Sequence, residues 1–344
     1  MKLTSLSILS DYIDNIRKWA YKDVYHIQNN VLNKNPYTSD FIHNYCFDKK
    51  KKLNKFFIFK KILMFYVKST VSYCLFFVNY LTFKILGKKS DVDFEHEVYI
   101  IDIFFLVDTI IKEGVYRDGY FSGLYEVLEK YNKEYVFLPR LHGVDKSPFK
   151  FNKLLRILNK DTSNKFILEY ELLSLVDILK ILAFILSYPI KQFELIQHED
   201  SDLDKIFNYE LFNSLPNTSF EAYTRYLVGR NISKRLSGDS KVFSWQEFQN
   251  LEKTFYRAIR ESNNRIVIYG CEFLIKYKSY LGMHITDTDV ELLITPHKTL
   301  LNGPYNYSKS SKHNFKNGVS LRYKGIFRFV VEHNIEPVLL ALLS

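Results

Sequence analysis

Seven residues that could bind a ligand or take part in catalysis lie at or just after the ends of predicted strands. They are Arg140, His142, Tyr269, Gly270, Asn302, Gly303 and Arg322. In open parallel sheets, ligands bind beyond the carboxyl ends of the strands, so these positions predict one cleft for an acceptor or an anion. An arginine there can hold a phosphate or carboxylate with two parallel hydrogen bonds. A histidine there can act as a general base.

The same residues also have plain structural interpretations. A salt-bridged Arg140 and a capping His142 would explain the segment LPRLHGVD (138–145) without any ligand. The pair Asn302 and Gly303 is typical of a simple turn. Gly270 is expected to let the chain turn sharply after the strand RIVIYG (265–270).

Asp102 is the main acidic candidate, because it interrupts the apolar run HEVYIIDIFF (96–105). A carboxylate in such a strand is either a catalytic base for an acceptor hydroxyl or one half of a buried ion pair. Cys271 is interpreted as a small buried hydrophobe, because no histidine lies near it in sequence. The sequence contains no dinucleotide, P-loop, zincin or serine-hydrolase signature, so we expect no cofactor and no metal site.

These candidate residues belong to segments that alternate between strand-like and helix-like patterns. The expected strands are 96–105, 134–138, 165–170, 265–270, 298–303 and 318–323, and the expected helices include 120–131, 151–159, 172–188, 220–236 and 245–262. The alternation predicts a Rossmann-like α/β fold, with an open, mostly parallel sheet and helices on both faces. The expected organisation is an N-terminal helical region (1–48), a basic amphipathic segment (49–89), a Rossmann-like acceptor domain (90–335) and the first strand of a further domain (336–344).

Composition places the chain among globular proteins of a reducing compartment. Hydrophobic residues make up 47% of the 344 positions, and only three cysteines occur. The first residues lack a secretory signal pattern, which favours a cytoplasmic location. The net charge of +10 comes almost entirely from residues 49–89, which contain no Asp, Glu or Arg. Its lysines are Lys49, Lys50, Lys51, Lys52, Lys55, Lys60, Lys61, Lys68, Lys84, Lys88 and Lys89.

The apolar centre of this basic segment indicates a membrane surface as partner. The run STVSYCLFFVNYLTF (69–83) has fifteen uncharged residues, whereas a spanning helix needs about 20. The flanking lysines favour a helix in the headgroup region on the inner face of the cytoplasmic membrane, with lysines reaching anionic lipid. A buried core helix and a true span are the alternatives. Nucleic acid is disfavoured, because no recognisable nucleic-acid-binding pattern accompanies the lysines.

Several strings in combination resemble a family of bacterial surface-carbohydrate biosynthesis proteins, associated with O-antigen or capsule assembly and similar to GT-B glycosyltransferases. They are YIIDIFF (99–105), YFSGLYEVLEKYNKEYVFLPRLHG (120–143), WQEFQNLEKTFYRAIRES (245–262), IYGCEFLI (268–275), ITPHKTLLNGPYNY (294–307) and VSLRYKGIF (319–327). The resemblance covers roughly residues 96–344. It implies a Rossmann-like N-terminal domain that holds the acceptor and a second such domain that binds the nucleotide-sugar donor.

Such proteins continue beyond the strand that EPVLLALLS (336–344) matches. We therefore expect the acceptor-binding half of a transferase that acts on a lipid-linked glycan and is inactive alone, with the donor half lost or supplied by a separate polypeptide. Asp102 and His142 would be catalytic, and the other strand-end residues would bind the acceptor. The alternative is a non-catalytic, membrane-docked interaction module that recruits a partner enzyme or a glycan.

Overall fold

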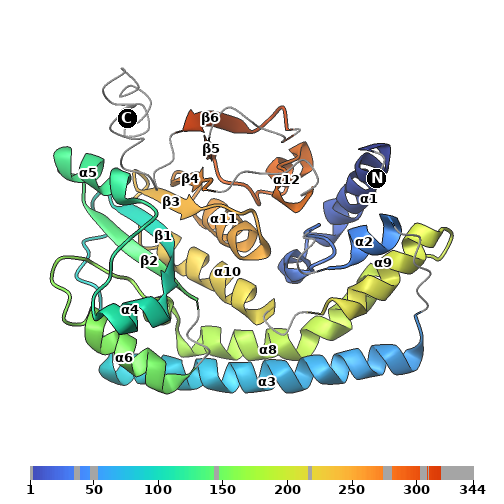
Figure 1. The fold of residues 1–344 in the computed structure, drawn as a ribbon, viewed down its shortest axis with the longest axis horizontal. Helices are drawn as coiled ribbons and strands as arrows, with labels where there is room; N and C mark the ends of the chain where they lie inside the picture. Colours follow the sequence, from blue (N-terminus) through green and yellow to red (C-terminus); the bar gives the residue numbers. More distant parts are fainter. Residues whose placement is uncertain are drawn as a thin grey trace.

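The sheet of this protein is open and entirely parallel. The structure is a computed structural model that describes residues 3–34, 39–46, 53–142, 147–215, 219–273, 281–302, 308 and 310–318. Six strands follow the order β2-β1-β3-β4-β5-β6 (Figure 1). They are β1 Tyr99–Leu106, β2 Tyr135–His142, β3 Lys241–Trp245, β4 Val267–Cys271, β5 Lys298–Asn302 and β6 Asn314–Gly318. The Rossmann-like α/β architecture expected from the sequence is confirmed.

Helices cover both faces of the sheet, as the continuous apolar strands require. The first five residues of β1 are buried, and neighbouring side chains point to opposite faces. Asp102 of β1 faces Arg225 of α10 (Ser219–Ser233) on one side. On the other side, Phe137 of β2 makes an edge contact with Tyr125 of α5 (Ser122–Lys130) at 5.3 Å between ring centroids.

Twelve α-helices are present among the described residues. Besides α10 they are α1 Leu3–Ala20, α2 Phe41–Cys46, α3 Lys55–Leu86, α4 Val107–Glu113, α5 Ser122–Lys130, α6 Pro148–Leu158, α7 Glu169–Leu172, α8 Leu175–Lys191, α9 Asp202–Asn213, α11 Asn250–Ser262 and α12 Asp287–Glu291. Three 3₁₀ helices, η1 Val24–Gln28, η2 Gln192–Leu195 and η3 Leu281–Met283, connect them.

Three elements differ from the sequence-based expectation, one of them β6, which precedes the strand expected at 318–323. The strand expected at 165–170 is wrong: Phe166 makes only an isolated bridge to Phe137, and α7 begins at Glu169. Strand β3 was not predicted, because its five residues lie directly before a segment with a helical pattern. The expected strand 318–323 lies outside the described residues except for Gly318.

Helix α3 is the longest element and extends along one side of the molecule, antiparallel to α8 (Figure 1). The expected apolar run 69–83 lies in its C-terminal half. Two tyrosine hydroxyls join the helices: Tyr73 donates to the Ile178 carbonyl at 3.2 Å and Tyr66 to the Leu186 carbonyl at 2.8 Å. The inward side of α3 belongs to the main apolar core that surrounds the sheet.

The N-terminal helical region forms a second apolar cluster with α9. Ile13 of α1 and Phe41 of α2 pack with Phe207 and Leu211 of α9. A buried ion pair between Arg17 and Asp289 of α12 connects this region to the end of the chain that carries β5. The N-terminal region is therefore integrated with the rest of the protein through both apolar and ionic contacts.

Candidate ligand site at the carboxyl edge of the sheet

The strand order creates a switch point between β1 and β3. The chain moves from β1 outward to β2 and then returns past β1 to β3. The pairing of β1 with β3 ends at Asp102 and Ser244, whereas its pairing with β2 continues to Leu106 and His142. The two strands therefore separate above Asp102. In doubly wound sheets this is the position where ligands bind.

Asp102 lies at the floor of this switch point and is completely buried. One carboxylate oxygen accepts from Arg140 Nε at 2.9 Å and from Arg225 Nη2 at 2.7 Å. The other accepts from Ser244 Oγ at 2.8 Å and from Arg140 Nη2. Both oxygens are thus occupied by donors from β2, β3 and α10.

Arg140 extends the network to a second carboxylate. Its Nη1 pairs with Glu252 of α11, and its Nη2 also donates to Ser244 Oγ at 3.0 Å and to the Trp245 carbonyl at 3.2 Å. Tyr256 of α11 hydrogen bonds Ser244 Oγ at 3.0 Å. The network fixes three strands and two helices relative to one another.

The electrostatics of the network follow from burial and opposite charge. Burial alone would raise the pKa of Asp102, but Arg140 and Arg225 hold that pKa below its ordinary value. Burial lowers the pKa of Arg225, which the charge of Asp102 partly opposes. Burial raises the pKa of Glu252 despite its contact with Arg140. Asp102 therefore remains an ionised, fully hydrogen-bonded carboxylate.

Two predicted site residues, Asp102 and Arg140, are brought together, and each takes the ion-paired form that the sequence left open as an alternative. Arg225, Ser244 and Glu252 were not singled out from the sequence. The sequence did contain a signal for Arg225. Nearly every neighbouring position of α10 is apolar or small, which is typical of a helix buried on most sides, and such a helix must also bury its arginine.

Aromatic rings gather at the end of β3, next to this floor. Trp245 makes edge contacts with Phe104 at 5.4 Å and Tyr120 at 4.2 Å between ring centroids, and packs on Phe273 at 4.9 Å. Its indole Nε1 is buried and has no hydrogen-bond partner among the described residues. Apolar and aromatic walls with a few polar groups are typical of ligand sites.

Gly270 and Gln246 form a close contact beside these rings. A Cβ atom at Gly270 would lie 1.7 Å from Gln246 Oε1, so the position needs glycine for close approach. The expectation that Gly270 makes a sharp turn is wrong, because it lies inside β4, paired with Ser244 and Thr299. Gln246 Oε1 accepts from Thr299 Oγ1 at 3.1 Å, which in turn contacts His313 Nε2 at 2.9 Å.

The remaining predicted site residues lie away from Asp102 and Arg140 or fall outside the described part of the chain. Tyr269 points to the opposite face of β4 from Gly270 and stacks on Phe243 at 4.9 Å. Asn302 ends β5 and its Nδ2 donates to the Phe273 carbonyl at 3.3 Å. His142 is the last residue of β2, but its side chain lies outside the described part. Gly303, Arg322, Lys49, Lys50, Lys51, Lys52 and the segment 336–344 also lie outside it.

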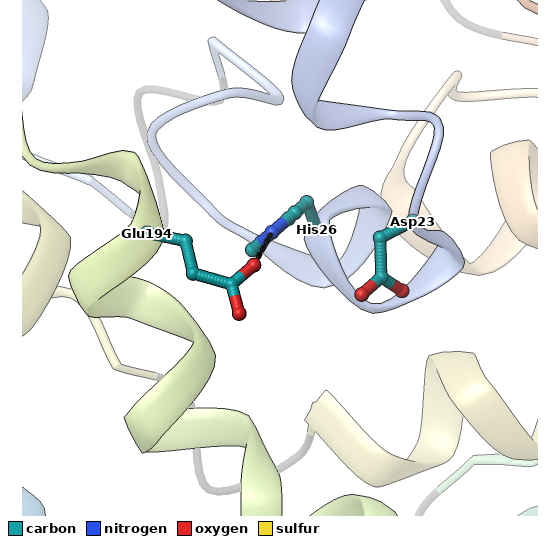
Figure 2. A group of neighbouring side chains, drawn as sticks. All are labelled: Asp23, His26 and Glu194. Carbon is teal, nitrogen blue, oxygen red and sulfur yellow. Dashed lines mark hydrogen bonds and ion pairs between the residues drawn. The ribbon is translucent and has the colours of Figure 1, made fainter.

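Among the described residues, Asp23, His26 and Glu194 form one group with the composition of metal ligands (Figure 2). Their donor atoms lie within 4.8 Å of one another. Lys191, however, places its ammonium 3.2 Å from Asp23 and 3.0 Å from Glu194. The lysine already supplies the cation that these carboxylates need, so the group is a surface ionic cluster. It was not predicted, because Glu194 lies 168 positions from His26 in the sequence.

No protein-family model matches this chain, and neither curated proteins nor solved structures give a significant match to it. Its function is therefore inferred from the fold, the geometry of the sheet edge and the sequence motifs.

Proposed function

We propose that this chain acts in the biosynthesis of a bacterial surface polysaccharide of the O-antigen or capsule type. Its role would be that of the acceptor-binding Rossmann-like half of a GT-B-like glycosyltransferase, with a lipid-linked glycan as acceptor. The observation that carries the proposal is the convergence of Asp102 and Arg140 at the switch point of the sheet, where this architecture binds ligands. The motif resemblance supplies the substrate class.

The proposed site has a rigid ionic floor and an aromatic wall. The ion-pair network holds Arg140 in one orientation. Arg140 therefore stabilises the floor of the site and does not move when a ligand binds. Tyr120 and Trp245 provide flat apolar surfaces next to it. The buried donors Trp245 Nε1 and Gln246 Nε2, which lack partners among the described residues, are suited to hydroxyl groups of a glycan.

The proposal assigns no proton transfer to Asp102. A general base must come within hydrogen-bond reach of the acceptor hydroxyl, and both oxygens of Asp102 are engaged by buried donors. Because neither oxygen of Asp102 is free to accept a proton, a second candidate function is also supported. In it the chain is a non-catalytic interaction module that recruits a glycan or a partner enzyme through the carboxyl edge of the sheet.

A binding and transfer assay tests the proposal. Purified protein is incubated with lipid-linked oligosaccharides from a capsule-producing bacterium and labelled nucleotide sugars, and both retention of the glycan lipid and transfer of label are measured. We expect retention without transfer, and about tenfold weaker retention for Tyr120→Ala than for the control Tyr131→Ala, whose side chain is 38% exposed. Transfer by the chain alone would contradict its assignment as one half. The absence of both signals would contradict the carbohydrate function.

Adding a separately produced donor-binding polypeptide distinguishes the two candidates. Label transfer in the mixture would identify the chain as half of a transferase. Retention that never leads to transfer in any mixture would favour the interaction module.

A further inference from the structure

We propose that the outward sides of α3 and α8 form one membrane-docking face, which lies flat in the headgroup region of an anionic bilayer. This inference goes beyond the proposed carbohydrate function. It depends on residues other than those at the carboxyl edge, and holds whether or not the chain binds a glycan.

Helix α3 is apolar on two opposite sides, only one of which is buried. The inward positions Phe65, Ser69, Ser72, Phe76, Asn79, Tyr80 and Phe83 recur every three or four residues and pack on the protein. The outward positions recur with similar spacing and are exposed: Phe56, Phe59, Leu63, Met64, Val67, Val71, Val78, Leu81, Ile85 and Leu86. Phe56 is 77% exposed and Ile85 is 79% exposed. An apolar row of this length marks an interaction surface.

Helix α8 continues this surface alongside α3. Its exposed side carries Leu175, Val176, Leu179, Leu186 and Ile190. The hydrogen bond from the Tyr66 hydroxyl to the Leu186 carbonyl places this row directly beside the outer edge of α3. At 1.5 Å per residue the 32 residues of α3 extend about 48 Å. Figure 1 shows both helices side by side along one border of the molecule.

The charges on this surface select an anionic partner. Residues 53–90 contain seven lysines and no acidic residue. Lys60 and Lys68 are exposed on α3, and Lys180 of α8 has a side chain that is 44% exposed. The acidic residue of α8, Asp177, faces inward, where it accepts from Ser174 and pairs with Arg230. Lysines beside exposed apolar rows are typical of helices that bind anionic membrane surfaces.

Two of the predicted membrane lysines do not belong to the face. Lys61 donates to Asn213 Oδ1 at 2.9 Å. Lys84 donates to the carbonyls of Tyr170 at 2.9 Å and Leu173 at 3.1 Å. Both ammonium groups are engaged by the protein, so we assign the lipid contact to Lys60 and Lys68 with Lys55, Lys88 and Lys89 at the helix ends.

The contacts of α3 also decide between lying on the membrane and crossing it. The helix is long and apolar enough to cross a bilayer, with a mean hydropathy of 1.4 and 28% of its most apolar window buried. Crossing would remove the packing of Phe76 and Phe83 on Tyr170 and would place the buried polar Asn79 in hydrocarbon. An in-plane helix keeps all these contacts. We therefore assign α3 to the membrane surface.

Liposome flotation tests this assignment. The whole chain is mixed with vesicles of phosphatidylcholine alone or of phosphatidylcholine with phosphatidylglycerol, and the floated fraction is measured against salt concentration. We expect flotation with the anionic vesicles that weakens as salt increases. Val67→Glu/Val71→Glu on α3 and Leu179→Glu/Leu186→Glu on α8 should each reduce binding at least about tenfold. Lys60→Gln/Lys68→Gln should reduce it to a similar extent.

The control is Val115→Glu/Tyr131→Glu, which changes two side chains, each 38% exposed, outside the face and should float like the wild type. All replaced side chains are exposed, and circular dichroism checks that the variants fold. Absence of flotation together with dimers in light scattering would overturn the proposal in favour of contact with a second copy. Retention in vesicles after alkaline carbonate extraction would overturn the in-plane orientation in favour of a span. Either result leaves the glycan-binding assay unaffected.

Discussion

Asp102 of β1 accepts a hydrogen bond from Arg225 of α10 at 2.7 Å, although the two residues are 123 positions apart. With Arg140 on the same carboxylate, this contact joins the central strands to the helix that covers them. Because the contact is fully buried, removing one partner leaves the other as a buried charge without its counter-charge.

Asp102→Asn is expected to lower the free energy of unfolding by about 3–5 kcal/mol, because it leaves the buried guanidinium of Arg225 without its anion and Arg140 with Glu252 alone. Urea denaturation followed by circular dichroism measures the change. Asp108→Asn is the matched control: its side chain is 67% exposed and pairs with Lys150 at 3.0 Å, so it should cost less than about 1 kcal/mol. A similar small cost for both variants would show that the buried network does not hold the site together.

Gly270→Ala is expected to destabilise the protein by about 1–3 kcal/mol, because the added methyl group overlaps Gln246 in a packed region. In the double variant Gly270→Ala/Gln246→Ala the two costs should be less than additive, since the second change removes the closest overlap and leaves only the contact with Pro296 Cγ at 2.8 Å. Gly119→Ala serves as control, because a Cβ atom at Gly119 would have no atom within 4 Å among the described residues. Strict additivity in thermal and urea unfolding would refute the direct contact.

Lys253 of α11 should make stability rise with pH above neutrality. Burial, with the nearby charges of Arg17 and Lys34, lowers its pKa to about 7, although Asp289 and Glu252 oppose the change. The ordinary pKa is 10.5, so between pH 7 and 9 the unfolded chain binds more protons than the folded one. The free energy of unfolding must then increase with pH.

Lys253→Met should flatten this dependence, which urea denaturation at several pH values between 7 and 9 measures. Lys34, whose pKa burial also lowers, leaves a residual slope of the same sign. A wild-type protein whose stability is constant or falls over this range would contradict the buried position of the Lys253 ammonium.

The sheet was predictable where strands are long and apolar. β1 and β4 stand out because their residues are buried on both faces and are rich in branched and aromatic side chains. β3 escaped prediction because KVFSW has only five residues, and the false strand at 165–170 arose because Ile167 and Leu168 are buried in a connection rather than in the sheet. Short apolar segments do not distinguish these cases.

The site was predictable only in part, because its contacts are not local. Asp102 was visible as a carboxylate inside an apolar strand and Arg140 as a polar residue at a strand end, but their pairing joins positions 38 residues apart. Ser244 lay outside every expected element, and Glu252 looked like an ordinary polar residue of the expected helix 245–262. The extent of the exposed apolar face was equally hidden, since the lysines of α3 interrupt its apolar pattern and α8 lies far away in sequence.

The fluorescence of Trp245 tests the central claim, a glycan site at the carboxyl edge of the sheet, most directly. The chain has two tryptophans, so Trp19→Phe leaves Trp245 as the only indole reporter. Titration with lipid-linked oligosaccharide should shift or quench its emission in a saturable way, and Tyr120→Ala in the same background should weaken the response about tenfold. Saturable binding of the glycan lipid with no change in Trp245 emission would place the glycan elsewhere and contradict a site at this edge.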